Sequence, residues 1–222
     1  MAERLAAIVS ETAPTLKAAG FRKRRHAFNR TVADGMTHVL SFQAGAFDPP
    51  GATHIAGLTP DLYGKFTVNL GVHVPGMRDL GGRPLGTWIN EYECHLRKRL
   101  GALAANGENE VWWDTLHPDA AVDVQAEIVE KGLPWLDRFP DADAVILAWR
   151  DHGFVDVGMH PAAPLDVAAL MVSRGDRERA EAVARAYVES ELSDHHREYV
   201  NTFLPTIGLD DLVAAVGDGD SD

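Results

Sequence analysis

The chain has 222 residues, of which 45% are hydrophobic and 24% are charged, and these values exclude intrinsic disorder as its default state. Its single cysteine, Cys94, excludes an internal disulfide and fits a reducing compartment. Residues 1–5 lack the apolar run of a signal peptide, and no stretch approaches the roughly 20 apolar residues of a membrane span. We therefore expect a cytoplasmic protein with no membrane partner.

The net charge of -12 is unevenly distributed along the chain. Residues 1–105 hold 13 Lys and Arg against 8 Asp and Glu, whereas the remainder holds 8 basic and 25 acidic side chains. Because an acidic protein repels nucleic acid, we expect no nucleic-acid partner. Two interpretations of the uneven charge remain open: the protein has two faces of opposite charge, or its two halves attract each other.

The first expected element is an N-terminal helix, because Leu5, Ile8 and Val9 recur at helical spacing. Pro14 lies inside this pattern and predicts either a kink or a second helix that begins there. Gly20 is the expected C-terminal stop of the helix.

Three strands are expected next. Residues 27–32 and 36–43 form a hairpin around the turn Asp34-Gly35, and residues 44–62, rich in Gly, Pro and Ala, form a long surface loop. The run 65–74 is the clearest strand in the sequence. Its side chains alternate, with Phe66, Val68, Leu70 and Val72 on one face and Thr67, Asn69, Gly71 and His73 on the other.

The segment from Trp88 to Leu103 is ambiguous. It contains good helix formers, but as a strand it would set one row of side chains, Cys94, Leu96, Lys98 and Leu100, against another, His95, Arg97 and Arg99. Periodicity alone does not decide between the two. Residues 111–113 are short and aromatic and predict extended chain.

From residue 118 the pattern becomes helical. Ala121, Val124 and Ile128 form one apolar stripe, and residues 165–192 predict a helical hairpin that turns at Gly175-Asp176. Residues 154–159 predict a short strand or an extended connection. The expected boundary residues of these helices are Gly132 as a stop, Asp141 as a cap, Gly153 as a stop, Asp194 as a cap and Pro205 as a stop.

Several strings in the first half resemble a known bacterial family. They are Leu16-Lys17, residues 20–24 (Gly-Phe-Arg-Lys-Arg), Phe28-Asn29-Arg30, Ser41-Phe42-Gln43, residues 66–72 (Phe-Thr-Val-Asn-Leu-Gly-Val), Cys94, Arg97, Arg99-Leu100-Gly101 and Trp112-Trp113. Over about residues 1–115 the chain resembles the family called domain of unknown function 4304. The resemblance implies a strand from Arg97 to Leu100. The family name carries no activity, so it transfers no catalytic residue, and the Pro-rich insertion at residues 46–62 departs from the family pattern.

Common catalytic and metal-binding motifs are missing from the sequence. There is no His-Glu-x-x-His or Gly-x-Ser-x-Gly motif, and one cysteine excludes a thiolate zinc cluster. Glu191 and His195 are better explained as a pair one helical turn apart. The glycine spacing of loop 76–83 is similar to that of a phosphate cradle, but Pro84 stands where a helix would continue. We expect no metal, no cofactor and no identifiable catalytic residue.

Basic residues are the first candidates for a binding site. Arg24 belongs to the run Arg22–Arg25, and Arg30 follows it closely. Their guanidinium groups could bind phosphate or the carboxylates of a protein partner. They could equally be a solvated strand edge that is protected from aggregation, and the sequence favours this simpler explanation.

The polar face of the expected sheet is the second candidate. Asn69 and His73 project from one strand, and Arg97 and Arg99 project from another. Of the adjacent indoles Trp112 and Trp113, which must face opposite sides, we assign Trp113 to this group. Such a set could bind a small anionic or planar ligand, unless a helix covers the face.

The sequence thus predicts an α+β fold, with an antiparallel sheet of four or five strands packed by an N-terminal helix and followed by an acidic helical C-terminal region. Residues 1–116 form the first part, residues 117–216 pack on it, and residues 217–222 are a tail. The main functional hypothesis is a non-catalytic binding or protein-interaction module. The alternative is a small-ligand binder or an enzyme that uses Asn69, Arg97 and Arg99.

Overall fold

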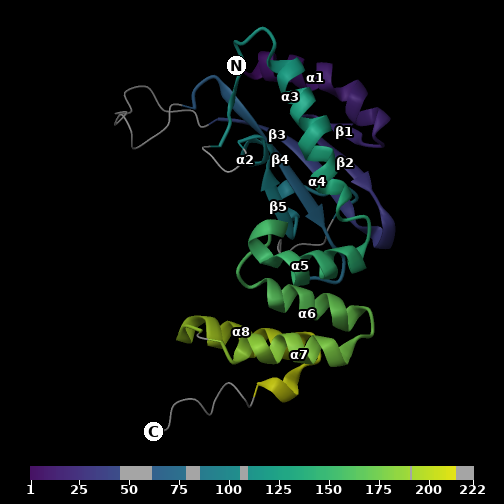
Figure 1. Cartoon of the computed structure of the whole chain (residues 1–222), viewed down its shortest axis with the longest axis vertical. Coiled ribbons are helices and arrows are strands. Elements are labelled where there is room, and N and C mark those ends of the chain that lie inside the picture. Colours follow the sequence, from purple (N-terminus) through teal and green to yellow (C-terminus); the bar gives the residue numbers. More distant parts are fainter. Residues whose placement is uncertain (46–61, 79–85, 106–109, 191, 214–222) are drawn as a thin grey trace.

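The computed structural model describes residues 1–45, 62–78, 86–105, 110–190 and 192–213. Most of the expected loop at 44–62 and the whole tail at 217–222 lie outside these ranges. Within them the fold is α+β, with an N-terminal helix, an antiparallel sheet and a C-terminal helical region, as predicted (Figure 1).

The described part of the sheet has six strands rather than four or five. Five of them follow the order β1-β2-β3-β4-β5, and the sixth, β6, pairs with β4. All the pairings are antiparallel. The ambiguous segment contains a strand, as the family resemblance implies, and then a short helix, α2 (Leu100–Ala104). The strands are β1 (Arg22–Arg24), β2 (Ala27–Thr31), β3 (Thr37–Ala44), β4 (Lys65–His73), β5 (Leu96–Arg99) and β6 (Trp113–Asp114).

The expected hairpin between β2 and β3 is confirmed. Asp34 and Gly35 both have positive φ, at 55° and 70°, in a short 3₁₀ turn from Ala33 to Gly35. Such angles suit Asp-Gly, because glycine has no Cβ and Asp tolerates the left-handed region. The turn sets the register in which His38 faces Arg30 and Ser41 faces Ala27.

One face of the sheet carries the hydrophobic core. The β4 residues Phe66, Val68, Leu70 and Val72 are all fully buried, as the alternation predicted. They pack under α1 (Ala2–Ala18), α3 (Ala120–Glu127) and α4 (Leu133–Asp137), which lie side by side over this face (Figure 1). Three stacked or tilted ring pairs join Phe28, Phe42, Phe66 and Trp113 in one row.

The other face of the sheet is partly covered by the segment Trp88–Cys94. Ile89 and Cys94 pack on Val39 in a small second core. Gly71 allows this close approach, because a Cβ there would lie 2.6 Å from the sulfur of Cys94. The cover is a short extended segment with one 3₁₀ turn, so it leaves the polar ends of β3, β4 and β5 accessible on either side.

Several expected helix boundaries differ from the structure. Pro14 lies within the continuous helix α1, so no second helix begins there, whereas Gly20 follows the helix end with φ 87°, as expected of a stop. Gly132 does not stop a helix: residues 128–132 form a π-helical turn that links α3 to α4. A glycine with ordinary helical φ costs some stability but does not end a helix, and neighbouring packing maintains this one.

From Ala120 on, the elements that the structure describes are all helices. The cap at Asp141 is confirmed, because its side chain accepts a hydrogen bond from the Ala144 amide at 2.8 Å. Gly153 interrupts α5 with φ 75°, but residues 154–157 then resume a helical turn, so the expected strand or extended connection is wrong. The last four α-helices among the described residues are α5 (Ala142–Val157), α6 (Ala163–Ser173), α7 (Arg177–Val188) and α8 (Asp194–Thr206).

The expected hairpin of helices is confirmed as α6 and α7, whose turn includes Gly175 with φ 81°. The final helix is also present, but its N-cap is Ser193 rather than Asp194, and Pro205 lies inside its last turn. The helices α5 to α8 stack below the sheet (Figure 1). No helix among the described residues is long and apolar enough to cross a membrane.

Candidate functional site

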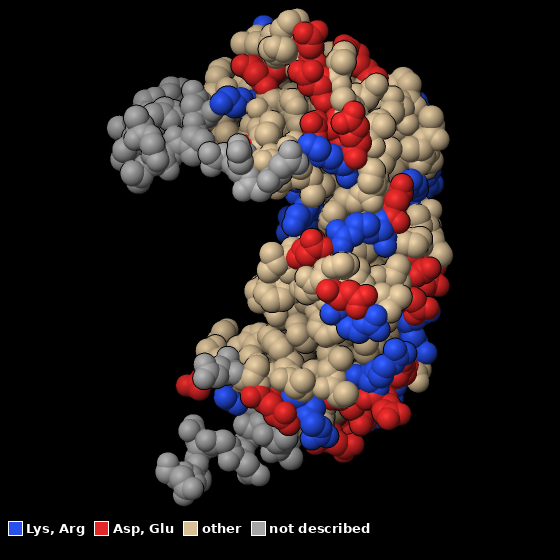
Figure 2. Space-filling view, in the orientation of Figure 1, with Lys and Arg blue, Asp and Glu red and all other residues tan. Residues whose placement is uncertain are grey.

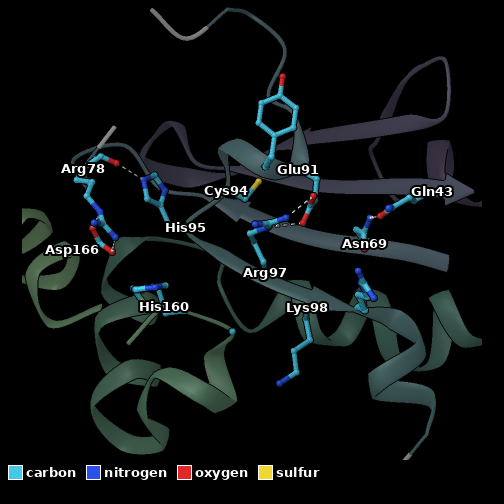
Figure 3. A pocket seen from close by; sticks show the side chains of 14 residues that line it. Gln43, Asn69, Arg78, Glu91, Cys94, His95, Arg97, Lys98, His160 and Asp166 are labelled. Atoms are coloured by element: carbon cyan, nitrogen blue, oxygen red, sulfur yellow. Dashed lines mark hydrogen bonds and ion pairs between the residues drawn. The ribbon is translucent and has the colours of Figure 1, made fainter. Parts of the chain in front are cut away.

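A cleft of about 540 Å³ opens on the polar side of the sheet, beside the edge strand β5. Figure 2 shows that the described part of the molecule curves around a hollow, with basic side chains on its inner wall at the level of β5. Figure 3 shows the side chains that line the cleft. They come from β3, β4 and the chain after it, the Trp88–Cys94 segment, His95 and β5, the connection between α5 and α6, and α6 itself: Gln43, Asn69, Arg78, Glu91, Tyr92, Cys94, His95, Arg97, Lys98, Arg99, Gly158, Met159, His160 and Asp166.

The helical half closes the cleft by docking on the outer edge of β5. The Arg97 amide donates a hydrogen bond to the carbonyl oxygen of Gly158 at 2.8 Å. Gly158 has φ 77°, and a Cβ at this position would lie 2.2 Å from the Arg97 carbonyl oxygen. Only glycine satisfies both the left-handed conformation and this contact. The connection after α5 therefore acts as the floor of the cleft at a fixed distance from the strand.

Arg97 occupies the middle of the cleft. Its Nε and one terminal nitrogen donate to the two carboxylate oxygens of Glu91, at 2.6 and 3.1 Å. This hydrogen bonding raises the pKa of Arg97 further above its ordinary value, so the guanidinium stays charged. The Arg97 side chain nevertheless remains 52% exposed. The ion pair thus orients a guanidinium and leaves part of it available to a ligand (Figure 3).

Arg99 is oriented in a similar way at one end of the cleft. It donates to both carboxylate oxygens of Glu110, at 3.3 and 3.0 Å, and its guanidinium lies 5.5 Å from the centre of the Trp112 ring. Asn69, its cross-strand partner, is buried and donates to Gln43 Oε1 at 2.7 Å. The two groups therefore present a charged and a neutral hydrogen-bonding surface next to each other.

The Lys98 side chain lies on the opposite face of the sheet from Arg97 and Arg99. It still lines the cleft, because β5 is at the edge of the sheet. Its ammonium donates to the Val155 carbonyl oxygen at 3.3 Å. Among the residues that the structure describes, Lys98 forms no ion pair with a carboxylate. The lining therefore carries four Lys and Arg side chains against the two carboxylates of Glu91 and Asp166. This local positive excess lies within a chain of net charge -12.

Arg78 and Asp166 form a buried ion pair at the other end of the cleft. Their closest atoms are 2.8 Å apart, and Asp166 is 4% exposed. Burial raises the pKa of Asp166, while the charge of Arg78 opposes that shift. Arg78 also donates to the Tyr199 hydroxyl at 2.8 Å, so it joins α6 to α8. Because the charge of Arg78 is neutralised by Asp166 within the fold, this ion pair has a structural role in shaping the cleft.

His95 fixes the backbone of Arg78 through a side-chain hydrogen bond. Its Nδ1 accepts a hydrogen bond from the Val74 amide at 3.0 Å, so the proton of the neutral ring lies on Nε2 and is donated to the Arg78 carbonyl oxygen at 2.8 Å. His73 is also buried, with its ring 5.1 Å from that of His95. His73 lies on the predicted face but not among the residues that line the cleft.

The remaining predicted site residues lie elsewhere. Trp113 is in the core against Phe66, at 5.9 Å between ring centres, and it is Trp112 that approaches the polar face. Arg30 lies on the helix-covered face, where it pairs with Asp137 and donates to the Ala19 carbonyl oxygen at 3.2 Å. The structure therefore brings Asn69, Arg97 and Arg99 together and leaves Trp113 and Arg30 outside this group.

Arg24 lies in a second, smaller pocket of about 330 Å³ on the same side of the sheet. Its guanidinium is 5.9 Å from the centre of the Trp88 ring. The walls of this pocket are Arg24, Arg25, His26, Ala27, Ser41, Trp88 and Asn90.

Sequence reasoning missed three important cleft residues: Arg78, His95 and Asp166. Arg78 belongs to a loop that was considered only as a phosphate cradle, and Asp166 lies inside an apolar helix 88 residues away. A charged residue in the middle of the apolar run 163–172 is a signal that a buried partner must exist. Nothing in the spacing indicates that the partner is Arg78.

The cleft offers many hydrogen-bond donors but few groups suited to proton transfer. Burial raises the pKa of the Cys94 thiol well above its ordinary value, so the sulfur stays protonated and unreactive. Asp166 is engaged by Arg78, and Glu91 is engaged by Arg97. Within the described ranges, no group of three or more His, Cys, Asp and Glu side chains is placed to hold a metal ion. The arrangement is suited to holding an anion.

The comparisons with known proteins identify the family. The model of the domain of unknown function DUF4304 matches residues 12–138, which is more than half of the chain. The chain therefore belongs to the DUF4304 family. The match extends past residue 115 and includes α3 and α4, the helices that cover the apolar face of the sheet. No curated protein and no solved structure shows a significant match to the chain.

Proposed function

We propose that this protein is a non-catalytic binding protein whose cleft beside β5 holds a small molecule through a carboxylate or phosphate group. The observation that carries the proposal is the convergence of Asn69, Arg97 and Arg99 in one cleft with an excess of positive charge. A volume of about 540 Å³ falls within the range of small-molecule sites.

An anion is the ligand that these side chains favour. Arginine binds carboxylate and phosphate through a planar fork of donors, and Arg97 and Arg99 are each already oriented by a carboxylate partner. Orienting the guanidinium in advance lowers the entropy cost of binding. Asn69 and Gln43 add neutral hydrogen-bonding groups for the rest of the ligand.

The proposal leaves catalysis out because the thiol and the carboxylates of the cleft are buried or paired, and His160, an exposed histidine of the lining, accepts a hydrogen bond from the Ala162 amide at its Nδ1. The Cys94 thiol is 1% exposed, and a protonated thiol is a poor nucleophile. A reactive centre needs a base within hydrogen-bond reach of the group that it activates. The carboxylates of this cleft are instead paired with arginines, which occupy the oxygen atoms that a base would use to accept a proton.

Isothermal titration at low ionic strength with citrate, inorganic pyrophosphate and AMP would test this proposal. We expect at least one anion to bind, and we expect Arg97→Ala and Arg99→Ala each to weaken it about tenfold or more, because a hydrogen bond to a charged group contributes about 1.5–3 kcal/mol. Arg150→Ala is the matched control, since Arg150 is exposed and pairs with its neighbour Asp151. Absence of binding for all three anions, or equal affinities in all variants, would contradict the proposal.

A further inference from the structure

The polar side of the sheet contains a row of residues that crosses five strands. The register of the sheet pairs Arg24 with Ala27, Ala27 with Ser41, Ser41 with Asn69, and Asn69 with Arg99. Directly paired residues of antiparallel strands point to the same face. The row therefore has an arginine at each end and small or polar side chains between them.

The two ends of the row are built alike. The Arg24 guanidinium lies over the ring of Trp88 at 5.9 Å, and the Arg99 guanidinium lies over the ring of Trp112 at 5.5 Å. Each end also opens into a pocket: the pocket of about 330 Å³ contains Arg24 and Ser41, and the cleft contains Asn69 and Arg99. Since Ser41 and Asn69 are cross-strand partners, the two pockets are neighbours on one surface.

The segment between the pockets is held firmly. Glu93 Oε2 accepts hydrogen bonds from both the amide and the side-chain nitrogen of Asn90, at 2.6 and 2.9 Å. Asn90 lines the smaller pocket, and the next residue, Glu91, lines the cleft. A ligand that reached both pockets would therefore meet a preformed surface rather than one that must order on binding.

The Arg24 end has the stronger unmatched charge. The strand β1 exposes Arg22 and Arg24 on this face of the sheet, and neither forms an ion pair with a carboxylate among the described residues. Arg25 follows in the turn with φ 54°, a conformation that is unfavourable for arginine. Uncompensated cations next to an indole, in a chain of net charge -12, are complementary to an external anion.

We infer that this row binds an extended acidic segment of a partner protein, with one carboxylate at the Arg99 end and another at the Arg24 end. The inference extends the proposed function, because the cleft supplies one of the two anion sites. Four inter-strand spacings of about 4.8 Å separate the ends by roughly 19 Å. An extended peptide rises about 3.3 Å per residue, so the two acidic side chains lie about six positions apart.

A peptide fits this row better than a nucleic acid does. The middle of the row offers Ser41 and Asn69, with Gln43 beside them, and these groups suit the amides and carbonyls of a peptide backbone. A nucleic acid carries a charge on every phosphate, and a protein of net charge -12 repels such a dense polyanion. A segment with two acidic side chains is repelled much less.

Selection of a random twelve-residue peptide library on the full-length protein, followed by fluorescence anisotropy of the enriched peptides, tests the inference. We expect enriched peptides to carry acidic residues about six positions apart. Both Arg24→Ala and Arg99→Ala weaken such peptides about tenfold, as loss of a charged hydrogen bond predicts. Arg185→Ala on α7 is the control, because Arg185 is exposed and remote from the sheet.

Parallel titrations with citrate separate this inference from the proposed function. Citrate is too short to span the row, so Arg24→Ala leaves its affinity unchanged while Arg99→Ala weakens it. If citrate behaves in this way but the enriched peptides lack paired acidic residues, or are unaffected by Arg24→Ala, the cleft stands as an anion site and the extended site is wrong. Tighter binding of a ten-nucleotide deoxythymidine oligomer than of any enriched peptide would also overturn the inference.

Discussion

The two faces of the sheet use the same residue types for different purposes. On the helix-covered face, Arg30 is 18% exposed, lies 4.7 Å from the Phe21 ring centre and pairs with Asp137. On the other face, Arg99 is 45% exposed and borders a cleft. An arginine that several elements surround becomes part of the packing, whereas one at an incompletely covered edge remains available to a ligand. The face on which a side chain lies therefore decides its role more than its charge does.

The largest expected effect comes from the apolar face. Phe66 is fully buried between Phe42 and Trp113, so Phe66→Ala leaves a cavity and lowers the free energy of unfolding by about 3–5 kcal/mol. Urea denaturation followed by tryptophan fluorescence measures the loss. Tyr92→Ala, in the segment that covers the opposite face, is the control, with an expected change within about 0.5 kcal/mol because the side chain is 65% exposed. Equal losses for the two variants would contradict the division into a packed face and a binding face.

The next largest effect is a pH dependence of the free energy of unfolding, which we expect from His38 on the packed face. Burial lowers the pKa of His38 from 6.5 to about 4, and its Nδ1 already accepts a hydrogen bond from Arg30 while Nε2–H donates to the Phe139 carbonyl oxygen. Between these pH values the unfolded chain takes up a proton that the folded one does not. Stability is therefore retained above about pH 6.5 and falls as the pH drops toward 4, by roughly 3 kcal/mol.

Urea denaturation at pH 7 and at pH 4, compared between the natural protein and His38→Gln, checks this prediction. Glutamine keeps hydrogen-bonding groups but does not titrate, so the variant should lose about 3 kcal/mol less on acidification. If the two proteins lose the same stability, His38 is not the group responsible. Acidification of the natural protein without any loss would contradict the buried neutral state of this histidine.

A smaller effect is expected where the covering segment touches the polar face. In Gly71→Ala the new Cβ would lie 2.6 Å from the Cys94 sulfur, so the segment must shift, at a cost of about 1–3 kcal/mol. Because Glu91 belongs to this segment, anion binding in the cleft should weaken as well. Gly86→Ala is the matched control, since the nearest atoms to its Cβ are 3.9 Å away. Unchanged stability in Gly71→Ala would show that the segment does not pack closely on β4.

The smallest effect on stability is expected in the cleft itself. The Arg97–Glu91 pair is half exposed, so Arg97→Ala should change the free energy of unfolding by less than about 1 kcal/mol. The same variant should lose most of its affinity for the anion. A large loss of stability, measured by urea denaturation, would show that Arg97 is part of the packing like Arg30.

Much of the sheet could be predicted because alternation and turn residues are local signals. The β4 pattern and the Asp34-Gly35 turn fix which residues of two strands share a face, and this led to Asn69 as a site residue. The neighbouring strand could not be predicted from periodicity alone, because β5 has only four residues before α2 begins, and its assignment depended on the family resemblance.

The parts that sequence reasoning missed depend on contacts between distant segments. Gly132 and Pro14 lie inside helices because neighbouring elements pack on them, and local preference does not record that packing. The assignment of Trp113 rather than Trp112 to the polar face required a choice between adjacent residues that point in opposite directions. The pairing of Arg78 with Asp166 depends on how α6 docks on the sheet, which no local pattern reveals.

The most direct test of the central claim is an amide chemical-shift titration of the isotope-labelled protein with citrate. We predict that the largest shifts occur at Asn69, Arg97 and Arg99, with little change at Phe66 or Leu70 on the same sheet. Two results would contradict the assignment of the cleft as the binding site. One is a set of shifts centred on the helix-covered face. The other is the absence of shifts at millimolar citrate, since a Kd of about 1 mM corresponds to only about 4 kcal/mol of binding free energy.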